Sequence, residues 1–354
     1  MNFAKTILSI VIVLFLVNIS GCKDQITPPP SHLEEPDTTS HNIIWEADTL
    51  GDWNSRLRAV WGSSPNNVWA TGWITRGDWG TNLVHYDGEK WEDYDYFEAD
   101  FMGMFGLDSN DIWAVGSNLG PFNEALVAKY NGFEWETIYI DINLPSLKAV
   151  WASAPDDVFA VGGKGTIIHY NGSDWEVMQT GWDKSLYDVW GFSSNDVYAC
   201  GGNNPTVGDT SKPLLLHYDG NKWTSLLDTV NYPEKVIETV WGSSPDNLYF
   251  QGSYDRVGLY QGNIDIGWNF LPVPDDNNDM NKIRGSSNNN IFLVGAFGIV
   301  VHYNGIDWQM YPELLKEPGG PTFWDTMVFD DKVFIVGSEY NVLKGIVYRG
   351  TIKN

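Results

Sequence analysis

The chain has 354 residues, with 46 acidic and 21 basic side chains and a formal net charge of −25. This balance argues against nucleic-acid binding, because most of that affinity comes from basic side chains that neutralise phosphates. It is compatible with neutral glycans, cationic partners or divalent ions.

The first 21 residues are predicted to be a secretory signal peptide. Lys5 gives a positive start, and residues 7–17 form an apolar run that is too short to span a membrane. The sequence Ile19-Ser20-Gly21-Cys22 resembles a bacterial lipobox, with Cys22 as the acylated residue. The resemblance implies an exported lipoprotein of the cell envelope, which we expect in the outer membrane. The alternative is an ordinary signal peptide with an incidental cysteine.

Residues 22–42 are predicted to be a solvated tether. They contain Pro28-Pro29-Pro30, Pro36 and many Ser, Thr, Glu and Asp, with few apolar side chains to bury. Residues 43–354 are predicted to form one domain.

From residue 43 onwards the sequence repeats. The clearest unit reads VWGSSPNNVWATG at 60–72 and VHYDGEKW at 84–91. Its tryptophan-glycine position recurs around residues 61, 105, 151, 190, 241, 284 and 327, and the repeat tyrosine at 86, 130, 170, 218, 260, 303 and 348. This spacing is typical of propellers and solenoids. Each unit holds four short runs rich in Val, Ile, Tyr and Trp between turn residues, which predicts the four strands of a propeller blade.

The last unit lacks a fourth strand of its own. Six units continue into a run that opens with Trp91, Trp135, Trp175, Trp223, Trp268 or Trp308, whereas only four residues follow Gly350. The segment 43–48 matches these runs at the other end of the chain. We therefore predict an all-β fold, a seven-bladed β-propeller with four antiparallel strands per blade, closed by the N-terminal strand.

The repeat resembles bacterial propeller repeats written VWGSSPxDVWAVG…HYDGxxW, which share their architecture with kelch, WD40 and BNR-type propellers. The resemblance covers residues 43–350 and implies the fold, and one fold hosts many functions. Proteins with similar repeats are sometimes labelled glucosyltransferases. The Tyr-Asp-Gly…Trp element resembles aromatic glucan-binding repeats, but the sequence contains no evident donor-nucleotide site.

Binding is predicted on the face that carries the loops between the second and third strands. The spacing from repeat glycine to repeat tyrosine varies there from 8 to 17 residues, and long loops on a rigid scaffold commonly bind ligands. The candidate binding residues in these loops, with the off-repeat Trp182, are Trp73, Arg76, Asp78, Trp79, Asn118, Phe122, Glu124, Asn203 and Asp209. Trp324 also lies outside the repeating tryptophan slots and is a further candidate for ligand contact. Trp73, Trp79 and Phe122 are expected to form a contact patch. The alternative for Trp79 is that it covers its own blade.

Metal and nucleophile chemistry are not favoured. Four histidines (His85, His169, His217 and His302) occupy one repeat position, where other units have Lys129, Leu259 and Val347, so they are expected to lie too far apart to share a metal ion. Cys200 is expected to be a small buried hydrophobe. Residues 275–279 resemble the start of a calcium loop but lack the glycine and glutamate of an EF-hand, which leaves a looser Ca²⁺ site as the minor alternative to a solvated loop. No other cofactor is expected.

Two function classes follow. The first, which we favour, is a non-enzymatic binding module, expected to be monomeric, for a glycan or a protein partner. The alternative is a glycan-active enzyme (a glycoside hydrolase, lyase or glucosyltransferase-like protein). It would use carboxylates on the face that carries the variable loops between the second and third strands. The sequence singles out no catalytic residue for it.

Overall fold

A computed structural model describes residues 38–95, 97–120, 124–140, 143–202, 213–227, 236–253, 258–274, 280–315, 319–339 and 343–353. The chain divides into one unit of Met1–Pro36 and a second of Asp37–Asn354, and all described residues belong to the second. The predicted signal peptide and Cys22 lie outside the described residues. Among the described residues, no helix is long and apolar enough to cross a membrane.

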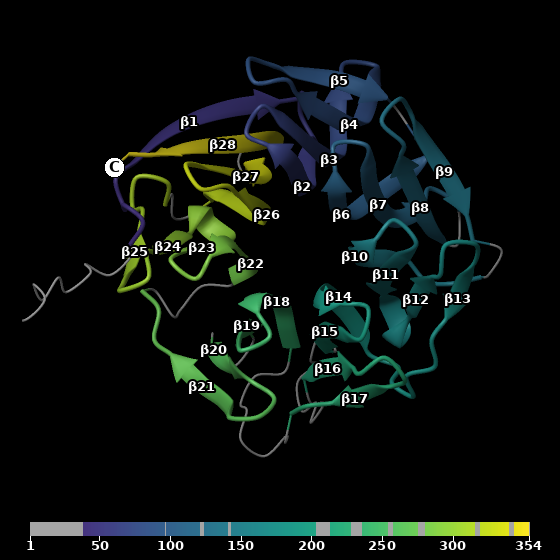
Figure 1. The fold of residues 1–354 in the computed structure, drawn as a ribbon. Helices are drawn as coiled ribbons and strands as arrows, with labels where there is room; N and C mark the ends of the chain where they lie inside the picture. Colours follow the sequence, from purple (N-terminus) through teal and green to yellow (C-terminus); the bar gives the residue numbers. More distant parts are fainter. Residues whose placement is uncertain are drawn as a thin grey trace, which may run out of the picture. The chain divides into compact units, whose positions relative to one another are not determined.

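The second unit consists of antiparallel sheets arranged around a centre (Figure 1). One sheet contains β1 (Ile43–Leu50), β28 (Lys344–Ile352), β27 (Lys332–Glu339) and β26 (Pro321–Val328). The next contains β2 (Arg56–Ser64), β3 (Asn67–Arg76), β4 (Trp79–Tyr86) and β5 (Trp91–Asp95). A third contains β6 (Ala99–Asp108), β7 (Asp111–Asn118), β8 (Ala125–Tyr130) and β9 (Trp135–Tyr139).

The remaining strands form three more sheets. One contains β10 (Leu147–Ala154), β11 (Asp157–Gly162), β12 (Ile167–Tyr170) and β13 (Trp175–Val177), with the 3₁₀ turn η1 (Gly163–Gly165). Another contains β22 (Met280–Ser287), β23 (Asn290–Gly295), β24 (Val300–Tyr303) and β25 (Trp308–Met310), with η2 (Ala296–Gly298). The last contains β14 (Ser185–Ser193), β15 (Asp196–Gly202), β16 (Leu214–Tyr218), β17 (Trp223–Ser225), β18 (Val236–Ser244), β19 (Asn247–Ser253), β20 (Gly258–Asn263) and β21 (Gly267–Leu271).

The predicted count of seven separate four-stranded blades is wrong. Five sheets of four strands stand separately, and the other eight strands form a single sheet. The two halves of that sheet join where Gly202 of β15 pairs with Val236 of β18. The join arises because β16 begins at Leu214, opposite Gly201, so Gly202 extends past β16 and its edge pairs with the incoming strand.

The N-terminal strand pairs with the C-terminal strand, as the sequence indicated. The β1–β28 ladder runs from Ile43 opposite Ile352 to Leu50 opposite Gly345, two residues beyond the predicted end at Asp48. Arg349 of β28 donates from Nε to Asp48 Oδ2 at 2.6 Å, which fastens the two strands together. The two ends of the domain therefore complete one sheet (Figure 1).

We call the strands nearest the centre, β2, β6, β10, β14, β18, β22 and β26, the inner strands (Figure 1). The tryptophan-glycine pair of the repeat connects each inner strand to the next. A Cβ atom added to Gly106 would lie 2.7 Å from the Trp61 ring, and one added to Gly285 would lie 2.7 Å from the Trp241 ring. The indole of one inner strand thus fills the space above the glycine of the next, which explains why both residues recur together.

The histidine position is structural. His85, His169, His217 and His302 each place Nε2 within 2.6–3.2 Å of the Asn or Asp that begins the neighbouring strand. Lys129 forms the equivalent contact with Asp111 at 2.8 Å. The register corrects two assignments, because Gln261 and Arg349, rather than Leu259 and Val347, take this position. The repeat-tyrosine position in these units is correspondingly Gly262 and Gly350.

Candidate functional site: the mouth of the central channel

A β-bulge near the start of each inner strand positions the candidate site. In β2 the pairing register with β3 shifts between Leu57 and Ala59, so Arg58 has no partner opposite it, and the other inner strands show the same shift. The bulged residues, each three positions before the tryptophan position, are Arg58, Met102, Lys148, Tyr187, Glu238, Asn281 and Trp324. Bulges commonly redirect side chains at functional sites.

All these bulged side chains line one cavity of about 220 Å³, together with Lys282. We call this space the mouth cavity. It lies at the N-terminal ends of the inner strands, on the face that also carries the β3–β4 hairpin, since Arg56 at the start of β2 pairs with Trp73 near the end of β3. This is the face on which the sequence predicted binding.

Two cations of the mouth cavity are held against aromatic rings. The guanidinium carbon of Arg58 lies 4.8 Å from the centre of the Trp324 ring, and Lys148 Nζ lies 4.1 Å from the centre of the Tyr187 ring. Both are cation–π distances. Burial lowers the pKa of Arg58 and of Lys148, and it raises the pKa of Tyr187. Both cations are therefore partly dehydrated before any ligand arrives.

Two donors of the cavity wall have no acceptor within the part of the chain that the structure describes. Arg58 Nε and Trp324 Nε1 are buried and lack a hydrogen-bond partner among the described residues. Buried polar groups are satisfied in the large majority of cases, so unsatisfied ones require an explanation. Asn281 differs, because its Nδ2 donates to the Phe323 carbonyl at 2.7 Å.

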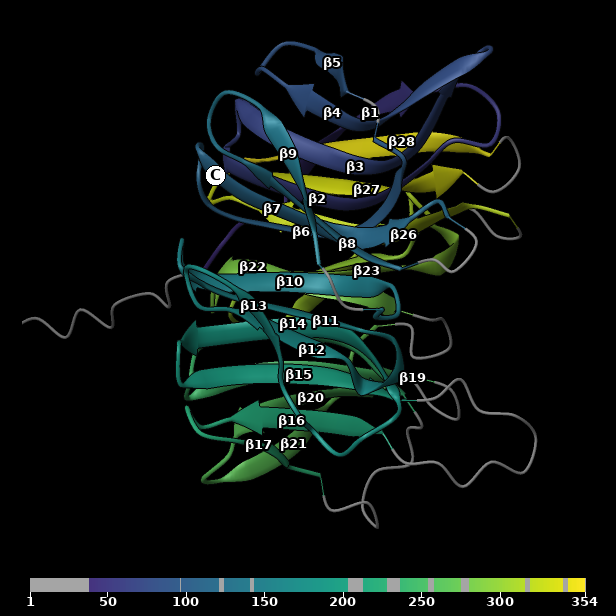
Figure 2. The ribbon, with the colours of Figure 1, turned by 90° about the vertical axis from the view of Figure 1, so that its right-hand side faces the viewer.

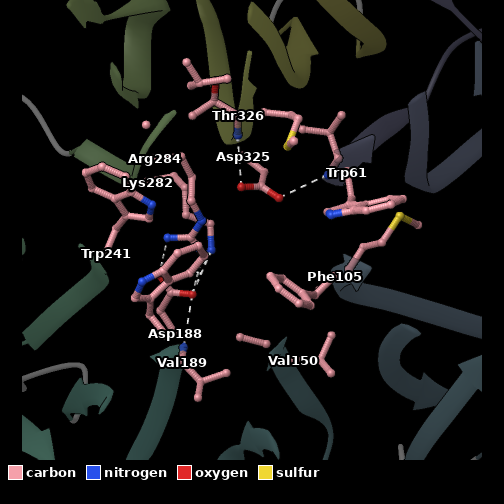
Figure 3. A pocket seen from close by; sticks show the side chains of 18 residues that line it. Trp61, Phe105, Val150, Asp188, Val189, Trp241, Lys282, Arg284, Asp325 and Thr326 are labelled. Carbon is pink, nitrogen blue, oxygen red and sulfur yellow. Dashed lines mark hydrogen bonds and ion pairs between the residues drawn. The ribbon is translucent and has the colours of Figure 1, made fainter. Parts of the chain in front are cut away.

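A second cavity of about 120 Å³, the channel cavity, lies among the inner strands (Figure 3). Its walls combine aromatic rings with a buried polar cluster. The residues labelled in Figure 3 are Trp61, Phe105, Val150, Asp188, Val189, Trp241, Lys282, Arg284, Asp325 and Thr326.

Asp188 is the centre of that polar cluster. It is fully buried and accepts hydrogen bonds from Arg284 at 2.8 and 3.0 Å, from Lys282 Nζ at 3.2 Å and from Thr239 Oγ1 at 2.8 Å. Burial alone would raise its pKa, but the charges of Arg284 and Lys282 outweigh burial and hold the pKa well below its usual range. The carboxylate also accepts the backbone N–H of Val240 on the next inner strand.

Asp325 links its own inner strand, β26, to the next inner strand, β2, in the same way. It accepts the N–H of Val60 on β2 at 3.1 Å and that of Thr326 at 3.0 Å (Figure 3). Burial raises the pKa of Asp325, in contrast to Asp188. Because both aspartates bridge successive inner strands, the polar cluster of the channel cavity is explained by structure, and the mouth cavity remains the candidate binding site.

The loop predicted between the second and third strands of the first unit, which contains Trp73 and Trp79, is a hairpin. Trp73 lies in β3 and Trp79 opens β4, and only Gly77 and Asp78 form the turn, which corrects the expectation of a loop. Figure 2 shows the hairpin projecting past its neighbours. Trp73, Asp78 and Trp79 help to line a hollow of about 570 Å³, and Trp79 is 61% exposed, so it does not cover its blade. Arg76 points instead to Asp93, with contacts of 2.8 and 3.0 Å.

The other predicted site residues do not join this hairpin into one patch. Asn118 and Glu124 brace their own loop, since Asn118 Oδ1 accepts the Glu124 N–H at 3.1 Å. Trp182 is half-buried against the core around β11 and β14. Phe122, Asn203, Asp209 and the calcium-like loop 275–279 lie outside the described residues.

The mouth cavity itself was not predicted from the sequence, and of its lining residues only Trp324 was a candidate, as a tryptophan outside the repeating slots. The signal was available, because the position three before each repeat tryptophan holds Arg, Met, Lys, Tyr, Glu, Asn or Trp within an otherwise regular motif. A position that varies in chemistry inside a fixed motif is a candidate for binding. Cys200 is buried opposite Asp188, and burial raises the pKa of its thiol. Within the described ranges, no three His, Cys, Asp or Glu side chains are grouped to hold a metal ion.

No protein-family model and no curated protein matches the chain. Several solved structures are similar over most of its length. YCF48 bound to a D1 peptide is 18% identical, with 88% of this chain and 97% of that one covered and a TM-score of 0.63. Virginiamycin B lyase from Staphylococcus aureus, a catalytically inactive histidine-to-alanine form with quinupristin, is 9% identical over 88% and 100% of the two chains, with a TM-score of 0.68.

The WD40 β-propeller domain of Doa1 is also similar, at 12% identity over 90% of this chain and 99% of that one, with a TM-score of 0.62. Identities this low are evidence for architecture and not for function. These likenesses show that the chain is a β-propeller.

Proposed function

We propose that this protein is a non-enzymatic binding propeller that receives an extended segment of a partner protein in the mouth cavity. The observation that carries the proposal is the convergence of all the bulged inner-strand side chains on one cavity. The cavity combines aromatic rings, cations and unsatisfied donors, a composition suited to anchoring a polypeptide segment. Its half-buried side chains are held by regular strands, so the site is formed before binding.

A protein partner is favoured over a glycan. Among the similar structures, YCF48 is described with a bound D1 peptide. The cavity of about 220 Å³ is small for a polysaccharide but has room for one or two side chains of a peptide. The aromatic hairpin with Trp79 adjoins it through Arg56 and Trp73, which extends the contact surface beyond the cavity.

The enzymatic alternative has less support. A lyase is among the similar structures, and the histidine-to-alanine form is described as catalytically inactive. None of the described residues that line the mouth or channel cavity is a histidine. The four repeat-position histidines are engaged with Asn or Asp at strand starts.

Site-specific photo-cross-linking tests the proposal. A benzoylphenylalanine at Met102, in the mouth cavity, is expected to give discrete protein adducts in the native host. The same probe at Asn66, an exposed residue in a β2–β3 turn on the opposite face, is the matched control. Equal adducts at both positions, or polysaccharide binding without any protein adduct at Met102, would contradict the proposal. Trp79→Ala should lower the adduct yield at unchanged melting temperature if the hairpin contributes.

We also propose, from the sequence alone, that the protein is exported and anchored through Cys22. A lipid anchor would place the domain at a membrane surface, with residues 22–42 as a tether. Cys22→Ala should release the protein from the membrane fraction or block its maturation. Unchanged fractionation and maturation would overturn this part.

A further inference from the structure

The mouth cavity gathers positive charge in a chain whose net charge is −25. Arg58 and Lys148 line its wall, and neither forms an ion pair with another residue in the described part of the chain. Arg56, beside Arg58, lies 3.7 Å from Asp100. Arg56 and Arg58 lie on β2 and Lys148 lies on β10, the inner strands on either side of β6, so the cations are grouped around one cavity and are not scattered over the surface.

The local charge count leaves one positive charge. Three cations, Arg56, Arg58 and Lys148, lie near two carboxylates, those of Asp100 and Glu238. Asp100 raises the pKa of Arg58 and Glu238 raises that of Lys148, but burial lowers both pKa values by more. Lys282, which also lines the mouth cavity, and Arg284 face two buried carboxylates, those of Asp188 and Asp325, so these four groups add no net charge. A monoanion would therefore neutralise the mouth, whereas a dianion such as phosphate would exceed the available charge.

The geometry also favours a planar, oxygen-bearing anion. Trp324 supports Arg58 from one side at 4.8 Å, which leaves the edge of the planar guanidinium as the binding surface. Arginine edges match carboxylates with two parallel hydrogen bonds. The unsatisfied Nε of Arg58 and Nε1 of Trp324 are donors that an acceptor could satisfy.

We infer that the mouth cavity binds a carboxylate, held by the Arg58 guanidinium and the Lys148 ammonium. The inference rests on the proposed function and names the recognised part of the partner segment. The carboxylate comes either from an acidic side chain or from the carboxyl terminus of the partner. Since the rest of the protein is strongly acidic, recognition depends on short-range contacts in the cavity more than on long-range attraction.

Ligand-observed NMR titrations of the full chain test the inference with small probes. N-acetylphenylalanine against N-acetylphenylalaninamide tests a terminal carboxylate. The α-amide of N-acetylglutamate against that of N-acetylglutamine tests a side-chain carboxylate. We expect the charged member of at least one pair to bind about tenfold more tightly, the scale of one charge-assisted hydrogen bond. Equal binding within both pairs, or tighter binding of inorganic phosphate, would overturn the inference.

Variants then locate the site. Arg58→Gln and Lys148→Gln should each remove the preference for the charged probe, and Arg58→Lys should restore part of it. Lys90→Gln is the matched control, because it removes the same charge from an exposed turn on the opposite face and should keep the full preference. Melting temperatures verify folding, and the two independent cations keep the test valid if one variant does not fold. Preference that survives in both Arg58→Gln and Lys148→Gln would exclude this site.

The cross-linking experiment separates this inference from the proposed function. If adducts at Met102 persist at full yield in Arg58→Gln, a partner occupies the mouth cavity without a carboxylate contact, and only the inference fails. If the unmodified protein gives no adduct at Met102, the proposed function fails as well.

Discussion

The indole of Trp151 lies directly against Gly191 on the next inner strand, where an added Cβ atom would be 2.6 Å from the ring. At the preceding pair of inner strands, β6 and β10, both positions hold other residue types. Phe105 stands in place of the tryptophan, and Ala152, which packs in the same core cluster, stands in place of the glycine. The smaller ring makes room for the methyl group, so the two positions conserve their combined volume.

This volume exchange predicts a coupled pair of substitutions. Phe105→Trp alone should reduce the free energy of unfolding by about 1–3 kcal/mol, because the larger ring overlaps the Ala152 methyl group. Ala152→Gly alone should cost about 1 kcal/mol. The double variant recreates the tryptophan-glycine pair and should be more stable than the sum of the single changes by at least about 1 kcal/mol. Additive losses in urea unfolding would show that the two residues do not share the space.

The Asp188 carboxylate predicts an unusually large loss on substitution. Asp188→Ala leaves Arg284 and Lys282 without their buried partner and should cost about 3–5 kcal/mol of unfolding free energy. Asp93→Ala breaks the more exposed pair with Arg76, which has similar distances, and should cost less than about 1 kcal/mol. Comparable losses of unfolding free energy in the two variants would mean that burial does not determine how strongly the Asp188 contacts stabilise the fold.

The sequence predicted the strand content and the pairing of the chain ends because both depend on local patterns. Alternating apolar residues, turn residues and the Trp45 match to Trp91 are visible without coordinates. The merging of two units into one sheet is not visible in the sequence. It depends on where β16 begins after an insertion, and therefore on the single pairing of Gly202 with Val236. Gln261 and Arg349 were missed at the histidine position because nearby tyrosines imitate the motif two residues early.

The candidate site lies on the face on which the sequence predicted binding, but it is lined mostly by other residues than the predicted set. Loop length directed attention to Trp73 and Trp79, which belong to a hairpin at the rim. The mouth cavity is lined by bulged residues such as Arg58 and Met102, which lie inside the regular repeat, and by Trp324, which the sequence marks as a tryptophan outside the repeating slots. Their convergence follows from ring geometry, and a single repeat read along the chain does not contain that information.

Removal of the N-terminal strand is predicted to destabilise the domain strongly. A chain that begins at Gly51 lacks β1, whose Trp45 packs edge-on to Tyr311 and whose Asp48 binds Arg349. We expect a loss of at least about 3 kcal/mol, the scale of removing one core tryptophan, and self-association through the exposed edge of β28. A chain that begins at Thr38 keeps β1 and should match the full-length protein. Similar melting temperatures for the two shortened chains would show that β1 contributes little.

His302 predicts a loss of stability on mild acidification. It is fully buried, with Nε2 3.2 Å from Asn290 Oδ1 and Nδ1 2.9 Å from His41 Nδ1. Burial, with the His41 charge as a smaller cause, lowers its pKa to about 3. An unfolded histidine titrates near 6.5, so below that pH the unfolded chain binds a proton that the folded chain excludes. Stability is therefore fully present above about pH 6.5 and decreases as the pH falls towards 3.

The magnitude of this effect can be measured against a natural replacement. Between pH 7 and pH 5 the difference in proton binding at His302 corresponds to about 2 kcal/mol of unfolding free energy. Gln261 occupies the equivalent position in another unit, so His302→Gln keeps a polar side chain there without a titrating group. Urea unfolding of this variant should lose about 2 kcal/mol less than the unmodified protein over the same pH interval. An unchanged pH dependence in His302→Gln would assign the acid sensitivity to other groups.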